Sequence, residues 1–193
     1  MVQPKLPITG NPEADLLLET NPLGLLLGML LDQQVPMEWA FIGPYLLQER
    51  MGGLDARKIA AMPEEEFLVI AKGPRAIHRF PGSMGKRVQA VCRVIVDEYD
   101  SDASRIWTEA KDGADLRGRL EALPGFGAEK SRIFIALLAK RFGVKPDGWQ
   151  EAAAPFGDDV ARSVADIDSA ETLALVREWK QARKKEGKAK SDP

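Results

Sequence analysis

The stretch from Leu123 to Ser131 limits the fold of this chain more than any other, because it breaks a helical pattern and restarts it within a few residues. Apolar residues at three- and four-residue spacing end at Leu123 and resume after Ala128, which is the pattern of two amphipathic helices. Between them, Pro124-Gly125-Phe126-Gly127 combines residue types that end helices and permit tight turns. The sequence therefore predicts two helices joined by a tight hairpin.

The same spacing runs through most of the 193 residues, so we predict an all-α fold. Asn11-Pro12 and Asn21-Pro22 each pair a helix N-cap with proline at the first helical position. Residues 72–86 contain Gly73, Gly82 and Gly85 as well as two prolines, and we predict a loop there between two helical groups. The predicted helices cover residues 12–20, 22–34, 37–51, 56–61, 64–72, 86–99, 116–122, 128–142 and 170–185.

Composition excludes several classes of protein. The net charge is −2 and the isoelectric point is near 5.6, so any basic surface must be local. The one cysteine, Cys92, lies in an apolar-periodic run and excludes a disulfide framework, a cysteine-ligated zinc site and a four-cysteine iron–sulfur cluster. We expect a cytoplasmic location, because the N-terminal residues lack a signal-peptide pattern and no apolar run reaches membrane-spanning length.

The start of the helix after Gly127 is a candidate site for an anion. The first N–H groups of a helix have no internal acceptor and lie at the positive end of the helix dipole. Lys130 and Arg132 add local positive charge. A phosphate bound there would be held independently of base sequence. The alternative is a tight αα-turn that binds no ligand.

Four segments, in order along the chain, carry a resemblance to a known family. Leu123–Ser131 resembles the hairpin of the helix-hairpin-helix, Gly-Pro-Asp superfamily of base-excision DNA glycosylases. Leu27–Val35 is similar to the glutamine-containing helix end of these enzymes, particularly in the 3-methyladenine branch, and Lys86–Val91 resembles the basic helix that precedes their hairpin. Phe142–Asp147 falls where the family has its catalytic aspartate. The resemblance covers residues 22–158.

The resemblance implies one helical domain over residues 1–193, two-lobed, with a cleft that binds duplex DNA and a pocket for a flipped-out damaged or mispaired base. It implies a monomer at the nucleoid, without an iron–sulfur cluster or other metal, and with no cofactor beyond a monovalent cation at the hairpin. The lack of a four-cysteine cluster is typical of the 3-methyladenine and 8-oxoguanine branches. The residues implied to contact DNA are Pro124, Gly125, Phe126, Gly127, Glu129, Lys130, Ser131, Gln33, Gln34, Lys86 and Arg87.

By the same resemblance, Asp147 is the catalytic residue, a carboxylate that stabilises positive charge on the sugar and activates water. An ordinary Asp-Gly turn is the other interpretation of Pro146-Asp147-Gly148. The acidic pair Asp158-Asp159 is the alternative source of a carboxylate.

Glu129 stands where bifunctional members carry a Schiff-base lysine, and Lys130 is rotated from it by about 100° on a helix, which favours a monofunctional enzyme. A catalytically inactive DNA-binding relative remains an alternative. A third alternative is a helical protein-interaction domain with no role in nucleic-acid binding.

Other conspicuous residues have two interpretations each. Trp39 and Trp149 are candidates for walls of the base pocket, or for ordinary packing residues. His78 is predicted to lie at the surface or at the DNA backbone. The basic loop around it either contacts phosphates or is a solvated charged loop. Residues 184–193 are predicted to form a disordered basic tail that either attracts DNA or keeps the chain soluble.

Overall fold

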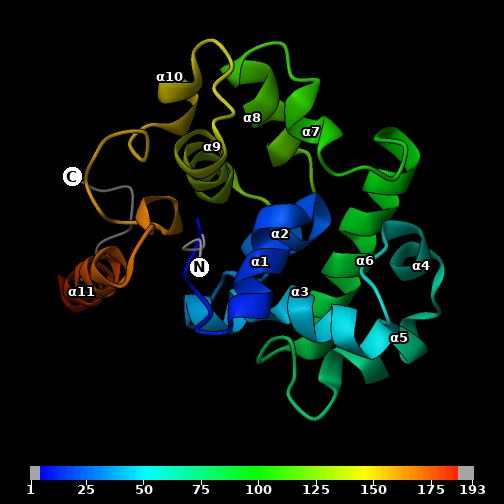
Figure 1. Ribbon diagram of the computed structural model, residues 1–193. Helices are drawn as coiled ribbons and strands as arrows, with labels where there is room; N and C mark the ends of the chain where they lie inside the picture. Colours follow the sequence, from blue (N-terminus) through cyan, green and yellow to red (C-terminus); the bar gives the residue numbers. More distant parts are fainter. Residues whose placement is uncertain (1–4, 187–193) are drawn as a thin grey trace. The chain divides into compact units, whose positions relative to one another are not determined.

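Helices are the only regular elements in the part of the chain that the structure describes, residues 5–186 of a computed structural model (Figure 1). The prediction of an all-α fold is confirmed. In chain order the elements are α1 (Pro12–Thr20), α2 (Pro22–Leu31), α3 (Met37–Met51), α4 (Ala56–Ala61), α5 (Glu64–Lys72), α6 (Pro81–Glu98), α7 (Arg105–Thr108), α8 (Gly113–Glu121), α9 (Ala128–Phe142), α10 (Trp149–Ala153), the 3₁₀ turn η1 (Val164–Asp166) and α11 (Ala170–Glu186).

The predicted loop over residues 72–86 is wrong in its second half, because α6 begins at Pro81. Proline is well suited to the first turn of a helix, where its missing N–H is not needed. A Cβ added at Gly85 would lie 3.6 Å from Phe67 and 3.7 Å from Ala71, so this glycine lies in ordinary contact with α5. Tertiary packing therefore extends a helix through residues that look like loop in the sequence.

The chain folds into two compact units, as expected of a two-lobed fold. Of the described residues, unit 1 comprises 5–7, 106–122 and 126–186, and unit 2 comprises 8–105 and 123–125. The first three residues of the predicted hairpin, Leu123 to Gly125, thus pack as part of unit 2. The single-domain assignment of residues 1–193 stays a prediction.

Unit 2 is built around α2, in which residues 23–31 are all buried. Helix α3 packs against it at two glycines. A Cβ added at Gly28 would lie 2.7 Å from Cδ1 of Phe41, and one at Gly43 would lie even closer to Cδ1 of Leu31. Such distances are too short for real Cβ atoms, so any larger residue at either position would force Phe41 or Leu31 to shift. Helices α4 and α5 in turn pack on α6 (Figure 1).

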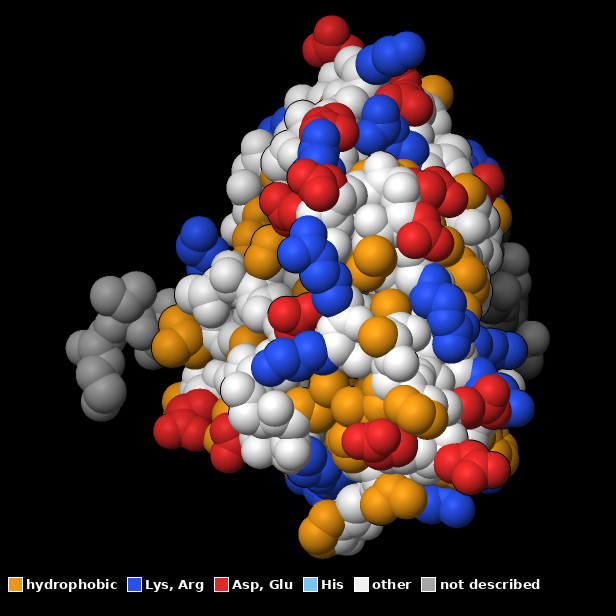
Figure 2. Space-filling view, turned by 90° about the vertical axis from the view of Figure 1, so that its right-hand side faces the viewer, with side chains coloured by type: hydrophobic (Ala, Val, Ile, Leu, Met, Phe, Trp, Pro, Cys, Tyr) orange, Lys and Arg blue, Asp and Glu red, His pale blue; other side chains and the backbone are white. Residues whose placement is uncertain are grey.

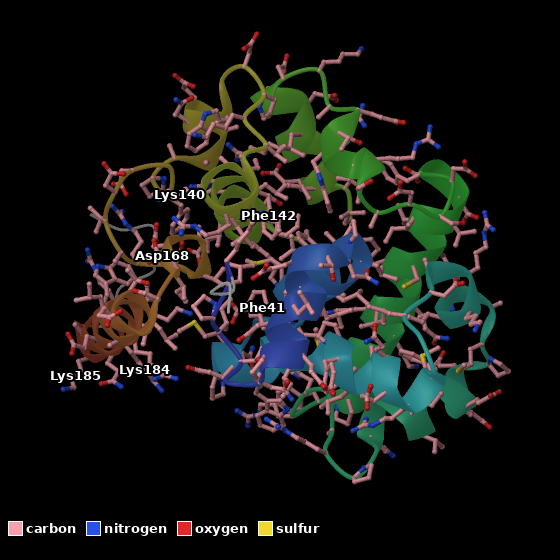
Figure 3. The ribbon with its side chains drawn as sticks, viewed as in Figure 1. Phe41, Lys140, Phe142, Asp168, Lys184 and Lys185 are labelled. Atoms are coloured by element: carbon pink, nitrogen blue, oxygen red, sulfur yellow. The ribbon has the colours of Figure 1, made fainter. Side chains whose placement is uncertain are left out.

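Unit 1 is built around α9, in which residues 133–139 are all buried. Phe134 meets Trp107 and Phe126 edge to face, with ring centroids 5.9 and 6.1 Å apart. Lys140 fixes the segment that follows α10, since its Nζ lies 2.6 Å from Oδ1 of Asp166 in η1. Figure 3 labels Lys140 together with Asp168, whose carboxylate pairs with Arg141 at 3.0 Å.

The predicted basic tail begins inside a helix. Lys184 and Lys185 lie in the last turn of α11 (Figure 3). Residues 187–193 of the predicted tail lie outside the described residues.

Within residues 5–186, no single helix is long and apolar enough to cross a membrane. Helices α1 and α2 meet the requirement of length and composition only as a pair, and they are bent by 112° relative to each other. Residues 23–31 of this pair form the buried centre of unit 2.

Replacing Phe134 by alanine should destabilise the protein strongly. The side chain is fully buried and carries both aromatic contacts of the core of unit 1, so we expect a loss of about 3–5 kcal/mol in the free energy of unfolding. Val69→Ala is the control, because Val69 is 71% exposed, and it should change stability by less than about 0.5 kcal/mol. Urea unfolding of the three proteins measures both values. Equal stabilities would contradict the described core.

Cys92 should be unreactive while the chain is folded. The thiol is buried, and burial raises its pKa to about 12, so almost no thiolate is present at pH 8. We expect a disulfide reagent such as Ellman's reagent to modify Cys92 slowly in buffer and rapidly in urea. Rapid modification of the folded protein at pH 8 would show that Cys92 is accessible.

Candidate nucleic-acid interface

The turn from Leu123 to Gly127 requires glycine at position 125. Gly125 has φ +85°, a backbone conformation that residues with a Cβ rarely adopt. An added Cβ would also lie 2.8 Å from Cδ1 of Leu30 and 3.4 Å from Cδ of Arg87. Conformation and packing within unit 2 therefore both explain this glycine.

Gly127 has no such internal explanation. Its φ of −93° and ψ of 174° are extended backbone that any residue adopts, and an added Cβ would meet no atom within 4 Å. Gly127 is exposed, as is Ala128. The space in front of Gly127 is open to a group from outside the chain.

Gly127 is also the N-cap of α9, and it supplies no side-chain hydrogen bond. The N-caps of α1, α2, α4 and α8 are Asn11, Asn21, Asp55 and Asp112, and each accepts a hydrogen bond from its helix. The first main-chain bond at the start of α9 runs from Ser131 N–H to Gly127 O at 3.0 Å. Helix geometry leaves the preceding amides without main-chain acceptors, so the start of α9 is suited to bind an anion.

Two of the residues predicted to contact DNA have their side chains inside unit 1. Phe126 is 5% exposed and packs on Phe134, and Ser131 is completely buried. Their side chains face the interior, so a DNA contact by Phe126 or Ser131 would have to use the backbone, and the assignment of these two residues stays a prediction. Lys130 Nζ lies 5.7 Å from the centre of the Phe126 ring, a cation–π distance, and Glu129 is partly exposed.

In unit 2, the predicted residues Gln33 and Arg87 converge on one methionine. Gln33 Nε2 lies 2.8 Å from Sδ of Met84, and Arg87 Nη1 lies 3.7 Å from the same sulfur. Since Gly125 lies against Arg87 and Leu30, the turn meets the end of α2 and the first half of α6 at this point. We call Leu30, Gln33, Met84, Arg87 and Gly125 the turn cluster.

His78 lies inside unit 2, which corrects the prediction of a surface or DNA-backbone contact. It is 1% exposed. The N–H of Phe80 donates to its Nδ1 at 3.1 Å, so Nε2 carries the ring proton and donates to the carbonyl of Gln33 at 2.9 Å. The sequence could not show this, because residues 33 and 78 come together only through packing. His78 fixes the backbone of Gln33.

The remaining predicted residues of unit 2 lie at or near the surface. Gln34 is exposed and has φ +55°, which is uncommon for a residue other than glycine. Trp39 is partly exposed, and its indole N–H donates to the carbonyl of Ala76 at 2.8 Å. Lys86 pairs with Glu64 at 2.5 Å, and both side chains are more than half exposed. On the face seen in Figure 2, basic and acidic side chains are interspersed.

Asp147 lies in an exposed turn of unit 1. Its carbonyl accepts a hydrogen bond of 2.7 Å from the N–H of Gly113, at the start of α8. Asp147 lines an open pocket of about 590 Å³ together with Asp112, Arg117 and Glu151. None of the hydrogen bonds or ion pairs among residues 5–186 involves this carboxylate. Trp149, the other predicted pocket residue in this unit, lies with its ring 5.9 Å from Lys145 Nζ.

Asp147 lies at the end of α8 that is away from the hairpin. Its carbonyl accepts from the N–H of Gly113, the first residue of α8, and the nine residues of α8 span about 13 Å before the chain enters the hairpin. Of the alternative acidic pair, Asp158 is engaged by Arg162 and by the N–H of Val160, and Asp159 is exposed.

Sequence reasoning passed over Asp32 and Met84. Asp32 is only 9% exposed and immediately precedes Gln33. The available signal was a single carboxylate at the end of the apolar run 23–31. Among the described residues, no group of three or more His, Cys, Asp or Glu side chains is placed to hold a metal ion.

Several solved structures are similar to this chain, and three of them are described here. No family model matches the chain, and no curated protein matches it. A trapped covalent intermediate of endonuclease III with DNA is 19% identical, with a TM-score of 0.46 over 68% of this chain and 57% of that one. A non-covalent endonuclease III–DNA complex is 20% identical, with a TM-score of 0.48 over 86% of this chain and 76% of that one. The H. pylori 3-methyladenine DNA glycosylase bound to 1,N6-ethenoadenine is 16% identical, with a TM-score of 0.49 over 94% and 99%.

Alanine at the two glycines of the turn should have different effects on stability. Gly125→Ala should lower the free energy of unfolding by about 1–2 kcal/mol or more, because of its positive φ and the contact with Leu30. Gly127→Ala should change it by less than about 0.5 kcal/mol, since the added methyl group meets no atom. Thermal and urea unfolding measure both. A large loss for Gly127→Ala would assign this glycine a structural role.

Proposed function

We propose that this chain binds double-stranded DNA through the turn 124–127 and the start of α9, and that it is a base-excision DNA glycosylase. The observation that carries the proposal is the open space in front of Gly127, at a helix start without a side-chain cap. The resemblance of four ordered segments to the helix-hairpin-helix, Gly-Pro-Asp superfamily supports the enzymatic part.

The binding chemistry follows from the exposed backbone. A phosphate at the start of α9 would accept hydrogen bonds from main-chain amides and would lie at the positive end of the helix dipole. Any side chain at position 127 would lie between the phosphate and these amides, which explains glycine there. Such a contact fixes the DNA backbone and reads no base sequence.

The chemistry that we propose is hydrolysis of the N-glycosidic bond of a flipped-out damaged or mispaired base. Glu129 has no amine with which to form a Schiff base, so the resemblance supports a monofunctional enzyme that leaves an intact abasic strand. Asp147 is the carboxylate that the resemblance assigns to the reaction.

A non-enzymatic protein that binds duplex DNA is the second candidate. The position of Asp147 at the start of α8 favours it, because about 13 Å of helix lie between this residue and the end of α8 that leads into the hairpin.

Duplex binding and base release separate the two candidates. Gly127→Ala should weaken duplex binding about tenfold or more, the scale of a lost hydrogen bond to a charged group, and binding should weaken with salt. Gly118→Ala is the matched control, since Gly118 is also exposed and its added Cβ also meets no atom, and it should keep the wild-type affinity. Fluorescence anisotropy at several salt concentrations measures both.

Base release would be scored on duplexes that contain uracil, hypoxanthine, 8-oxoguanine or an alkylated purine. Release of one base, with strand cleavage only after alkali, is the result expected of a monofunctional glycosylase. Salt-dependent binding without release from any duplex favours the non-enzymatic candidate. Absence of duplex binding would reject both.

A further inference from the structure

The longest stretch of the chain without an acidic residue covers residues 67–96. It holds six of the 27 basic residues and none of the 29 acidic ones, although the whole chain has a net charge of −2. All six basic side chains are exposed, and they are Lys72, Arg75, Arg79, Lys86, Arg87 and Arg93. Lys86 pairs with Glu64, whereas none of the ion pairs among residues 5–186 involves the other five. Unit 2 therefore carries a local excess of positive charge.

Loop 73–80 lies within this stretch, and α3 holds its backbone in place. The indole N–H of Trp39 donates to the carbonyl of Ala76 at 2.8 Å, and the guanidinium of Arg50 donates to the carbonyl of Arg75. Surface loops are usually more mobile than the elements that they connect, because little holds them. This loop is instead fixed to a helix by two side chains.

The middle of the loop is buried, and its flanks are exposed. Ile77 and His78 are 0% and 1% exposed, and both ring nitrogens of His78 are hydrogen-bonded. Arg75 and Arg79, on either side of them, are exposed. The guanidinium carbon of Arg79 lies 4.7 Å from the centre of the Phe80 ring, a cation–π distance that restricts this side chain. Two cations thus face solvent from a backbone that is already ordered.

The spacing of these two arginines suits a row of phosphates. Arg75 and Arg79 stand four positions apart, so their Cα atoms are separated by at most about 14 Å. Duplex DNA carries one negative charge per about 1.7 Å of its axis, so both guanidinium groups can meet phosphates of one stretch of backbone. Arginine offers phosphate a rigid fork of donors, and an ordered loop loses little entropy on binding.

We propose that Arg75 and Arg79 bind the phosphate backbone of a DNA duplex, and that loop 73–80 is a DNA-contacting surface within unit 2. The proposal rests on the duplex binding in the proposed function, and it requires neither Gly127 nor catalysis. Arg87 continues the surface to the turn, since a Cβ added at Gly125 would lie 3.4 Å from its Cδ. Phosphate contacts read no base sequence, so this surface binds damaged and undamaged duplexes alike.

The salt dependence of duplex binding tests this surface. Arg75→Gln combined with Arg79→Gln should lower the slope of log affinity against log salt concentration by about 1.8, or about 0.9 for each lost phosphate contact. Arg75→Lys combined with Arg79→Lys keeps both charges and should keep the slope. The control is Arg57→Gln combined with Lys58→Gln, which removes the same charge from exposed positions of α4 and should also keep the slope. Fluorescence anisotropy with an undamaged duplex at several salt concentrations measures all four proteins.

The outcomes separate this proposal from the proposed function. An unchanged slope in the glutamine variant, or an equal fall in the control, overturns the role of the loop and leaves the turn as the binding site. A lower slope in the glutamine variant, with wild-type affinity in Gly127→Ala, supports the loop and rejects the turn. Failure of the wild type to bind the duplex rejects both.

Two further measurements exclude other roles for the arginines. The glutamine variant should unfold at the wild-type temperature, because both side chains are exposed and outside the ion pairs of residues 5–186. Loss of folding would assign them a structural role and overturn the proposal. Weaker binding of polyglutamate by this variant, with an unchanged slope for the duplex, would identify an acidic protein as the partner and overturn it too.

Discussion

The close approach of Gly125 to Leu30 and Arg87 is the constraint on which the candidate interface depends. It fixes the turn against the end of α2 and the first half of α6, and it is possible only because residue 125 has no Cβ and adopts a positive φ. The chain leaves the turn through Gly127, whose backbone is then free to face outward at the start of α9. One glycine serves packing within the protein, and the next leaves room for a group outside it.

Local sequence patterns predicted most of the helices and the hairpin, because helix periodicity and Pro or Gly punctuation act over a few residues. They failed where packing between distant segments decides the outcome. Helix α6 begins at Pro81 because its first turns pack on α5, although residues 81–85 contain two glycines. His78 was predicted to lie at the surface, and it is buried because its ring bonds to the backbone of Gln33 and Phe80. The residues around position 78 do not indicate that Gln33 lies beside this histidine.

The candidate site shows the same division between local and non-local information. The nine residues of the hairpin could be identified from their own pattern, since turn chemistry is local. The order of motifs along the chain also suggested Asp147, but order does not fix distance. Asp147 lies at the start of α8, and about 13 Å of that helix lie between it and the end that leads into the hairpin. Asp32 was missed for the converse reason, because its burial cannot be read from a single carboxylate at the end of an apolar run.

Two departures from local rules have no explanation inside the chain. Gly127 has no internal reason to be glycine, and Gln34 adopts a positive φ without being glycine. Proteins usually satisfy such local preferences, and the exceptions concentrate at functional sites, where a ligand supplies what the chain lacks. A duplex bound at the turn would explain the first, since its phosphate would occupy the space before Gly127. This open helix start without a side-chain cap is the strongest argument for assigning function to the turn.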